Sequence, residues 1–526
     1  MFWKADNPLR TYGDPYSDWS ILQAGTFFAK EGFVENYFLP KRNSIPPVYY
    51  THYPPLPDLL NGVVQRLGFD RMRHFRFLPI MASLLGLAFW WVFLARAISA
   101  WIATISLFAM AFSPMFYRFA DSLHEHSYSI FFLFASFYFW REFCESRGRD
   151  AFFYGLLAWS MAFLQSLASF EYILLTHVFF FGYAWLISGE RIGRWPWIMV
   201  SAPTAGFALH VLQNAWQMGG LQAAVWDLTD AFLYRTFSIG SQSALPLPSL
   251  AAYLEVTNQR LESVLPDPVR VLGLLALGLL WFYGERFQKF PESAMARTSL
   301  RMVLVLGAGG ISWWITFPQH TWIHAAVARH IAPAVVLLLA SGIVVAVRVA
   351  WRIRRMNRAV ALTLWVFSAG MAGFMVYPTT LSLRLWNPNS HFHHAQACSL
   401  DRLLPKKAAI ITPQFPQGLA TPPIMYYTNR PYIMIAPTTS LEIMGAVCAV
   451  QAVDSTRPCF YMHIVKLEDS PLCRFLMQYG VETYHYEENK IVIEVYELNV
   501  PAILELLERQ SAGRASAAPK SKGELP

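Results

Sequence analysis

The side chains that could perform acid–base chemistry gather in a few short segments. One segment, GDPYSDWSILQAG at residues 13–25, carries Asp14 and Asp18 just before a helix-like run. Another, YRFADSLHEHS at residues 117–127, combines a cation with acids and imidazoles; these are Arg118, Asp121, His124, Glu125 and His126. Carboxylates and imidazoles can transfer protons or bind a divalent metal. Both segments are therefore candidates for a reaction centre.

Three further segments extend this set. SFEY contributes Glu171, and YYTHYPPLPDLLNG, residues 49–62, contributes His52 and Tyr53. The segment FPQHTWIHAAVARHIAP, residues 317–333, contributes His320, His324, Arg329 and His330. All five segments flank apolar blocks, where buried polar groups are rare without a functional reason. We interpret them as one cluster at a membrane face.

The composition is typical of a membrane protein. The chain has 526 residues, of which 55% are hydrophobic and 14% are charged, whereas soluble domains carry about 25% charged residues. The net charge of +8 could suggest nucleic-acid binding, but the basic residues lie in short loops, where membrane topology explains them. The sequence therefore predicts a polytopic membrane protein that does not bind nucleic acid.

Long apolar blocks predict about ten membrane-spanning helices, each of roughly 17–25 residues. They lie near residues 75–95, 98–117, 127–143, 151–168, 172–188, 196–213, 268–284, 300–317, 326–347 and 359–377. Arginine concentrates in the loops at one end of these blocks, and the loops at the other end contain only Arg118. By the positive-inside rule, the arginine-rich loops face the cytoplasm and the polar cluster faces the periplasm or cell exterior.

This topology divides the chain into four regions. They are an external loop at 1–73 with amphipathic interfacial helices at about 18–31 and 56–67, a transmembrane helical domain at 74–378 with a large external loop at 214–267, an external α/β domain at 379–508 and a disordered tail at 509–526. Because an external first loop needs a preceding span, we expect a first span upstream of this sequence.

The α/β domain is predicted from alternating strand-like and helix-like segments. Strands are expected at KAAIITPQF, RPYIMIAPT, CFYMHIV and KIVIEVYEL, and helices at LEIMGAVCAV and CRFLMQYG. Four cysteines fall in this region, namely Cys398, Cys448, Cys459 and Cys473. In an oxidising compartment they could form two disulfides, or they could remain buried thiols.

Several acidic residues and histidines also have purely structural explanations. Asp14 could begin a turn with Pro15, and Asp18 could cap the helix that begins at Trp19. His320 and His324, spaced i and i+4, would share one helix face and could bind a metal. Histidines at the membrane interface more often only form hydrogen bonds. The cluster as a whole is stronger evidence than any one member.

The sequence resembles the GT-C class of integral-membrane glycosyltransferases, in the branch of protein O-mannosyltransferases and aminoarabinose or galacturonic acid transferases. SDWSILQAGTFFAKEG is similar to the family's external loop, in which an acid pair precedes a helix that ends in glycine. YYTHYPPLPDLLNG resembles the family's His/Lys-Pro-Pro-Leu stretch, and the C-terminal region contains YYTNRP. Ser17 stands where the family's first acid often lies.

The resemblance implies an enzyme that transfers a sugar from a polyprenyl-phosphate donor to a lipid, glycan or protein acceptor on the non-cytoplasmic side. Aligning the helix on its closing glycine places the family's acid at Asp18, with Asp14 as second choice. This carboxylate would accept the proton of the acceptor, and a single displacement would invert the anomeric centre. The leaving phosphate needs positive charge; the candidates are Arg329 first, then Arg118, Arg235, Lys41 and Arg42.

We expect other polar residues of the cluster to bind the substrates. They are His52, Tyr53, His124, Glu125, His126, Glu171, His320 and His324. No cofactor is certain from the sequence, but a divalent metal could be held by His124, His126, His320 and His324 with Asp18 or Glu125.

Two other functions fit the sequence. A transporter or flippase of lipid-linked saccharides would need ionisable groups near the middle of the membrane, for which His177 and His210 are candidates. A non-catalytic membrane assembly protein would keep the fold without the chemistry. Replacement of Asp18 would abolish turnover in an enzyme and would leave a scaffold unaffected.

Overall fold

The computed structural model describes two compact units, which are treated separately below. The described residues are 15–517 without 46, 114, 115, 117, 118, 190–192, 238–248, 263–266, 287–290, 354–357, 367, 371, 372, 374–397, 414–429, 436–438, 464–470, 489 and 490. The first unit takes in residues 28–39 and 51–386, and the second takes in residues 7–27, 40–50 and 387–526. The predicted external loop at 1–73 is thus divided between the units. Residues 28–39 and 51–73 belong to the first unit, and residues 15–27 and 40–50 belong to the second.

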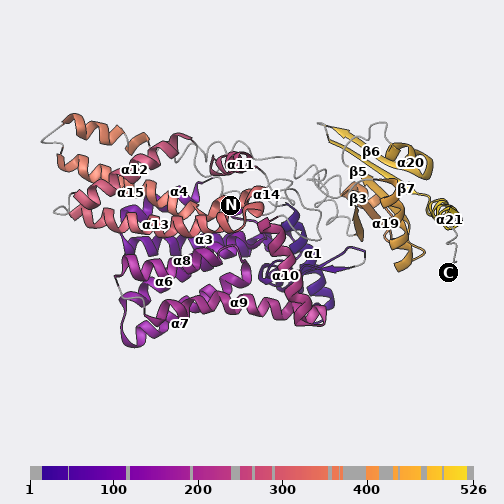
Figure 1. Ribbon diagram of the computed structural model, residues 1–526, viewed down its shortest axis with the longest axis horizontal. Helices are drawn as coiled ribbons and strands as arrows, with labels where there is room; N and C mark the ends of the chain where they lie inside the picture. Colours follow the sequence, from indigo (N-terminus) through magenta and orange to yellow (C-terminus); the bar gives the residue numbers. More distant parts are fainter. Residues whose placement is uncertain are drawn as a thin grey trace, which may run out of the picture. The chain divides into compact units, whose positions relative to one another are not determined.

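The first unit is helical (Figure 1). Its helices are α2 (Leu56–Arg66), α3 (Met72–Ala97), α4 (Ala100–Ala111), α6 (Glu125–Glu145), α7 (Gly148–Ala168), α8 (Ile173–Gly182) with a π-helical end (Tyr183–Ile187), α9 (Arg194–Met218), α10 (Leu221–Phe237), α11 (Leu250–Glu262), α12 (Asp267–Arg286), α13 (Pro291–Thr316), α14 (Pro318–Ile323), the 3-10 helix η3 (Ala325–His330) and α15 (Ala332–Ile353). Most of the longer helices coincide with predicted apolar blocks, in which backbone groups must bond within their own segment. Helices α10 and α11 instead lie within the predicted external loop at 214–267.

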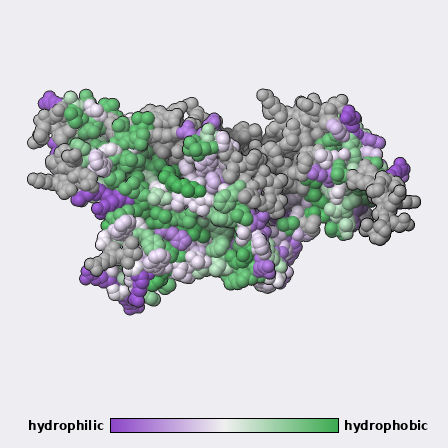
Figure 2. Space-filling model, viewed as in Figure 1, coloured by the Kyte–Doolittle hydropathy of each residue, from purple (hydrophilic) through white to green (hydrophobic). Residues whose placement is uncertain are grey.

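Among the described residues, four helices are long and apolar enough to cross a membrane. They are Met72–Ala97, Gly148–Ala168, Glu292–Thr316 and Ala332–Arg352. Other apolar helices among the described residues, such as α4, are shorter. The protein is therefore built as an integral membrane protein, while the count of ten spans stays a prediction. Large hydrophobic areas cover the surface of this unit (Figure 2).

Aromatic side chains fill the interior of the helical unit. Trp90, Phe93, Phe137 and Phe179 are at most 1% exposed, and the rings of Phe137 and Phe179 stack with centroids 3.6 Å apart. They join α3, α6 and α8 into one core. This packing holds these three helices together, and α6 carries Glu125 as its first residue.

One glycine allows a close approach beside the polar cluster. A Cβ atom added at Gly310 of α13 would lie 2.6 Å from the carbonyl oxygen of His330. A larger residue at this position would therefore push η3 away from α13. Gly310 thus allows the backbone of η3, which carries Arg329 and His330, to pack directly on α13.

The second unit contains a five-stranded mixed sheet. Its order is β4 (Tyr432–Ile435), β3 (Ala409–Pro413), β5 (Cys459–His463), β7 (Ile491–Leu498) and β6 (Gly480–Glu488). β3 is parallel to β4 and to β5, whereas β7 is antiparallel to β5 and to β6. In register, Ile410 faces Tyr432 on one side and Phe460 on the other.

Helices α19 (Ser440–Val453), α20 (Pro471–Tyr479) and α21 (Val500–Ala517) complete this α/β part (Figure 1). Four strands and two helices lie where the sequence predicted them. The strand β6 was not predicted, because its sequence GVETYHYEE is rich in charge. α21 reaches Ala517 and so takes in part of the segment predicted to be disordered. None of the five cysteines, all of which are described, forms a disulfide.

N-terminal residues also belong to the second unit. They are the first part of α1 (Pro15–Glu31) and a short hairpin, β1 (Lys41–Arg42) and β2 (Val48–Tyr49). Ser44 forms a parallel bridge with Tyr432 at the edge strand β4, and the ring of Trp19 lies 5.4 Å from that of Tyr432. The predicted interfacial helices at about 18–31 and 56–67 correspond to α1 and α2.

Candidate active site

A buried cation lies between two buried acids in the helical unit. Nη2 of Arg329 donates to Oε2 of Glu171 at 2.8 Å and also bonds Oε1 of Glu125. The side chains of Arg329, Glu125 and Glu171 are 4%, 1% and 6% exposed. Charges this far from water persist only when they are paired and hydrogen-bonded. The pairing therefore holds three segments of the chain together.

The three residues come from helix ends that lie far apart in the sequence. Glu125 is the first residue of α6, where the helix dipole favours negative charge. Glu171 lies in the turn between α7 and α8, and its amide donates to the hydroxyl of Ser169 at 3.1 Å. Arg329 lies in η3, just before α15. The site thus lies at the end of the bundle opposite the arginine-rich loops that follow α6 and precede α9.

Two neutral histidines face the second acid. Nε2 of His320 and Nε2 of His330 lie 3.5 and 3.4 Å from the Glu171 carboxylate. Burial, together with His324, holds the pKa of His320 well below its usual range. Burial and the neighbouring charge of Arg329 lower the pKa of His330 to about 3. Both imidazoles are therefore uncharged at neutral pH.

Hydrogen bonds also fix which nitrogen of His320 carries the proton. The indole Nε1 of Trp313 lies 3.3 Å from Nδ1 of His320, and an indole N–H can only donate. Nδ1 must therefore accept, which leaves the proton on Nε2. That nitrogen is 2.9 Å from the hydroxyl of Tyr53, which in turn donates to Oε1 of Glu171 at 3.1 Å. A chain of hydrogen bonds thus runs from the indole of Trp313 through His320 and Tyr53 to the carboxylate of Glu171.

The segment that carries Tyr53 is held by helices α9 and α10. Asp227 accepts from the Thr51 hydroxyl at 2.7 Å and lies 3.4 Å from the ring of His52. Burial opposes ionisation of Asp227, but the hydrogen bonds from His52 and Thr51 outweigh it and lower its pKa. The carbonyl of Thr51 meets His210 at 2.7 Å and accepts from Asn214 at 3.0 Å. These contacts place Tyr53 over Glu171.

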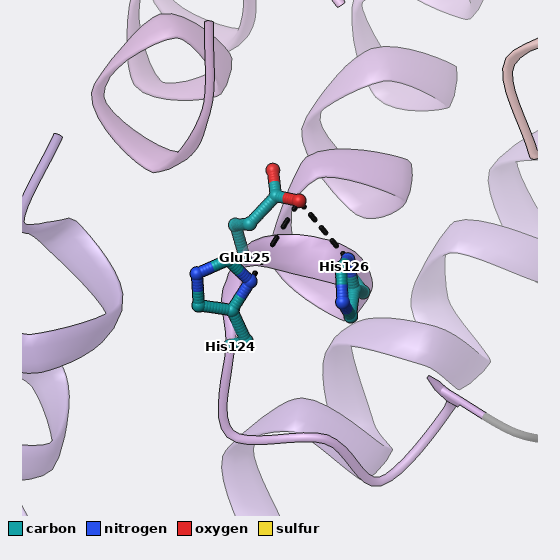
Figure 3. Close-up of side chains that lie close together, drawn as sticks. All are labelled: His124, Glu125 and His126. Atoms are coloured by element: carbon teal, nitrogen blue, oxygen red, sulfur yellow. Dashed lines mark ion pairs between the residues drawn. The ribbon is translucent and has the colours of Figure 1, made fainter. Parts of the chain in front are cut away.

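Glu125 also lies close to the two histidines that flank it in the sequence, His124 and His126. Nδ1 of His126 and Nδ1 of His124 lie 3.0 and 3.8 Å from the same oxygen, Oε1, of Glu125. Figure 3 shows both imidazoles turned toward that carboxylate. One ligand atom from each residue lies within 4.8 Å of the others. Two imidazoles and a carboxylate are ligands that zinc and related divalent metals accept, so the group could hold such an ion.

Part of the Arg329 guanidinium remains available for a ligand. Its Nε and Nη1 are buried and have no hydrogen-bond acceptor among the described residues. A cavity of about 20 Å³, with room for about one water molecule, is lined by Arg329 together with His126, Tyr172 and Ser127. Buried donors of a charged group are normally satisfied. The two nitrogens therefore mark a place where an anion or water would bind.

The structure brings together most of the predicted substrate-binding residues. Tyr53, His124, Glu125, His126, Glu171, His320 and Arg329 are joined by the contacts above. The rings of His324 and His320 are tilted by 36° and have centroids 4.5 Å apart. Among the described residues, the possible metal group consists of His124, Glu125 and His126 and includes neither of these two histidines. The guanidinium of Arg235 lies 4.9 Å from the centre of the Tyr53 ring.

The other candidates lie outside the described residues or in the second unit. Asp14 and Arg118 lie outside the described residues. Asp18, 6% exposed in the first turn of α1, belongs to the second unit. Lys41 lies over the ring of Phe27 and Arg42 over that of Tyr50, also in the second unit. Their roles stay predictions.

Sequence reasoning overlooked two residues of the network. Trp313 lies inside an apolar block and gives no signal that distinguishes it from a core tryptophan. Asp227, in the segment AVWDLTDAF, is an acid among apolar residues and could have been noticed. Neither could be assigned to Tyr53 or His320 without the tertiary structure.

Solved structures share this fold. ArnT from Cupriavidus metallidurans, in a structure with bound undecaprenyl phosphate, aligns with a TM-score of 0.57 at 12% identity, over 94% of this chain and 95% of ArnT. The oligosaccharyltransferase of Archaeoglobus fulgidus, tethered to an acceptor peptide, aligns with a TM-score of 0.52 at 11% identity, over 93% of this chain and 70% of that protein. No protein-family model matches the sequence. No curated protein matches it either. The fold is thus that of GT-C membrane glycosyltransferases.

Proposed function

We propose that this protein is a membrane glycosyltransferase that transfers a sugar from a polyprenyl-phosphate donor to an acceptor. The observation that carries the proposal is the buried Arg329, which offers two unsatisfied donors beside two carboxylates and neutral histidines. The solved ArnT structure of this fold contains undecaprenyl phosphate, and the archaeal oligosaccharyltransferase holds an acceptor peptide. The acceptor here is a lipid, a glycan or a protein.

Arg329 is the proposed binder of the donor phosphate. A lipid phosphate is a good leaving group, and it needs positive charge more than a proton donor. Arginine is a permanent cation with several N–H donors, which suits it to phosphate oxygens. Nε and Nη1 of Arg329 lie on different edges of the guanidinium and would each donate to one phosphate oxygen, while Nη2 stays on the two glutamates. Arg118, Lys41 and Arg42 are further candidates for the same charge.

Asp18 is the proposed general base. It accepts the proton of the acceptor hydroxyl as the bond from the sugar to the phosphate breaks. The acceptor attacks opposite the leaving phosphate, so the anomeric centre is inverted. Asp14 is the second choice for this base. His52, Tyr53 and the histidines of the cluster then bind the sugar and the acceptor.

A divalent metal is an optional part of this site. His124, Glu125 and His126 would hold it, and it would supply positive charge for the donor phosphate. Glu125 Oε1 also bonds Arg329, so the ion and the guanidinium would share this carboxylate. The site would face the periplasm or cell exterior, because the arginine-rich loops lie at the other end of the helices.

The test is transfer by the purified full chain from a panel of radiolabelled polyprenyl-phosphate sugars to a membrane extract. We expect label transfer that falls about 100-fold in Arg329→Gln, the effect typical of losing one charge-stabilising donor, and that is abolished in Asp18→Asn. Arg149→Gln, an exposed arginine at the start of α7, is the matched control.

Each other result has a distinct meaning. Full transfer by Asp18→Asn would reject Asp18 as the base and leave Asp14. Full transfer by Arg329→Gln would reject Arg329 as the phosphate ligand. No transfer from any donor would favour a transporter or an assembly protein. The transporter is disfavoured by its own candidate groups, since His177 and His210 both contact backbone carbonyl oxygens.

A further inference from the structure

A groove opens at the opposite end of the helical unit, between the end of α6, the start of α7 and the start of α9. Its volume is about 630 Å³, within the range of about 300–1,000 Å³ that small-molecule sites occupy. Gly155 lies where α7 approaches Phe143, and a Cβ atom added there would lie 3.0 Å from the Phe143 ring. Small residues on α7 thus leave room for the groove.

The walls of the groove are apolar and partly open. Phe143 meets Trp195 edge to face, with ring centroids 5.3 Å apart. Phe152 and Leu156, on the α7 side, are 72% and 52% exposed, and Ile198 of α9 is 39% exposed. α7 is one of the helices able to cross a membrane. We therefore expect this apolar groove to face lipid chains.

Positive charge gathers at one side of this groove. Arg147 lines it and forms no ion pair or hydrogen bond with the described residues. The guanidinium of Arg194 lies 5.0 Å from the centre of the Trp195 ring, which also lines the groove. No acidic residue is among the lining residues. Of the nearby acids, Glu142 and Glu145 are both paired with Arg141, and Asp150 lies in the first turn of α7 outside the lining.

We propose that this groove binds one anionic glycerophospholipid of the surrounding membrane. An acyl chain lies between α7 and α9, and the headgroup phosphate lies between Arg147 and Arg194. Basic pockets between membrane helices on the cytoplasmic side bind anionic headgroups, and the arginine-rich loops place this groove on that side. The proposal does not depend on the proposed transferase reaction.

The test is lipid binding to the purified full chain in detergent, by native mass spectrometry during titration with phosphatidylglycerol or phosphatidylcholine of the same chain length. We expect phosphatidylglycerol to bind more tightly. Arg147→Gln and Arg194→Gln should each weaken this binding about fivefold, the factor that corresponds to one basic residue near an anionic lipid. Arg149→Gln, two residues from Arg147 and outside the lining, should bind like the unchanged chain.

Binding of the acyl chain in the groove is tested separately with Ala151→Phe, which fills the groove without changing its charge. This variant should lose binding of both lipids, provided that its melting temperature in lipid-free detergent is unchanged; Leu156→Trp replaces it if it unfolds. Equal affinity for the two lipids, or an Arg147→Gln variant indistinguishable from Arg149→Gln, would overturn the proposal. Displacement of the lipid by inorganic phosphate alone would point to a soluble anion instead.

Discussion

Arg329 uses a single nitrogen, Nη2, to bond both Glu125 and Glu171. This leaves its two other nitrogens without an acceptor among the described residues, beside a cavity with room for about one water molecule. The same residue therefore has a structural and a proposed functional role. Buried pairs of this kind contribute little net stability when intact, but their rupture leaves an uncompensated charge.

The structural role of Arg329 predicts a large effect on stability. Arg329→Gln leaves two buried carboxylates without their cation and should lower the free energy of unfolding by about 3–5 kcal/mol. Thermal unfolding in detergent measures this change. Arg352→Gln is the control, since its ion pair with Glu292 is 44% exposed on the arginine side and should contribute at most about 1 kcal/mol. Equal effects of the two variants would reject the structural role.

The neutral histidines predict a pH dependence. The folded pKa of His330 is about 3, whereas an unfolded histidine titrates near about 6.5. As pH falls from about 6.5 toward about 3, His330 binds a proton in the unfolded chain but not in the folded chain. The free energy of unfolding therefore decreases. His330→Asn should flatten this slope by at most about 1.4 kcal/mol per pH unit. Unfolding followed at several pH values checks it, and an unchanged slope would contradict it.

The triad of His124, Glu125 and His126 predicts metal binding that can be measured without a reaction. Zinc added to the metal-free chain should raise its melting temperature, because a ligand that binds only the folded state stabilises it. The double variant His124→Ala/His126→Ala should lose this shift, whereas His74→Ala, at a half-buried histidine of α3 outside the triad, should keep it. A shift that survives in the double variant would place the ion elsewhere.

At the scale of elements, the site depends on how helix ends are held together. The segment of Thr51, His52 and Tyr53 has no regular secondary structure, yet α9 and α10 fix it through His210, Asn214 and Asp227. Hydrogen bonds from two helices thus position a loop residue over Glu171.

These hydrogen bonds predict that Asp227 affects the reaction indirectly, by positioning Tyr53. Asp227→Ala removes the bonds to Thr51 and His52, so Tyr53 should lose its position over Glu171. A misplacement of about 1 Å can reduce a rate about 100-fold, and we expect a loss in kcat of up to this size. Glu255→Gln, an acid of the neighbouring α11, is the control. Wild-type kcat in Asp227→Ala would show that the contacts of Asp227 with Thr51 and His52 do not position a reacting group.

The molecule as a whole consists of a membrane-spanning helical unit and an α/β unit that also includes part of the N-terminal segment. Trp19 is fully buried and packs on Tyr432, and Ile45 joins the core of the C-terminal sheet. Residues near the start of the chain thus complete a unit formed mainly near its end. This architecture is shared with ArnT and the archaeal oligosaccharyltransferase.

This arrangement predicts that the N-terminal segment stabilises the α/β unit. Trp19→Ala should lower the stability of that unit by about 3–5 kcal/mol, the usual effect of truncating a buried aromatic residue. Limited proteolysis of the full chain, with cleavage followed after residue 398, measures the effect. Trp101→Ala, 66% exposed on α4, is the control. No increase in cleavage for Trp19→Ala would contradict this role.

The sequence by itself determined the apolar helices, most of the C-terminal strands and the polar cluster around Glu125, Glu171 and Arg329. These follow from local properties, namely the length of apolar runs, the alternation of strands and the scarcity of polar groups beside membrane helices. The tertiary structure alone decided which carboxylates share Arg329, which nitrogen of His320 carries its proton and which unit contains Trp19. Such pairings join residues far apart in the chain, and nothing in the local sequence records the distance between them.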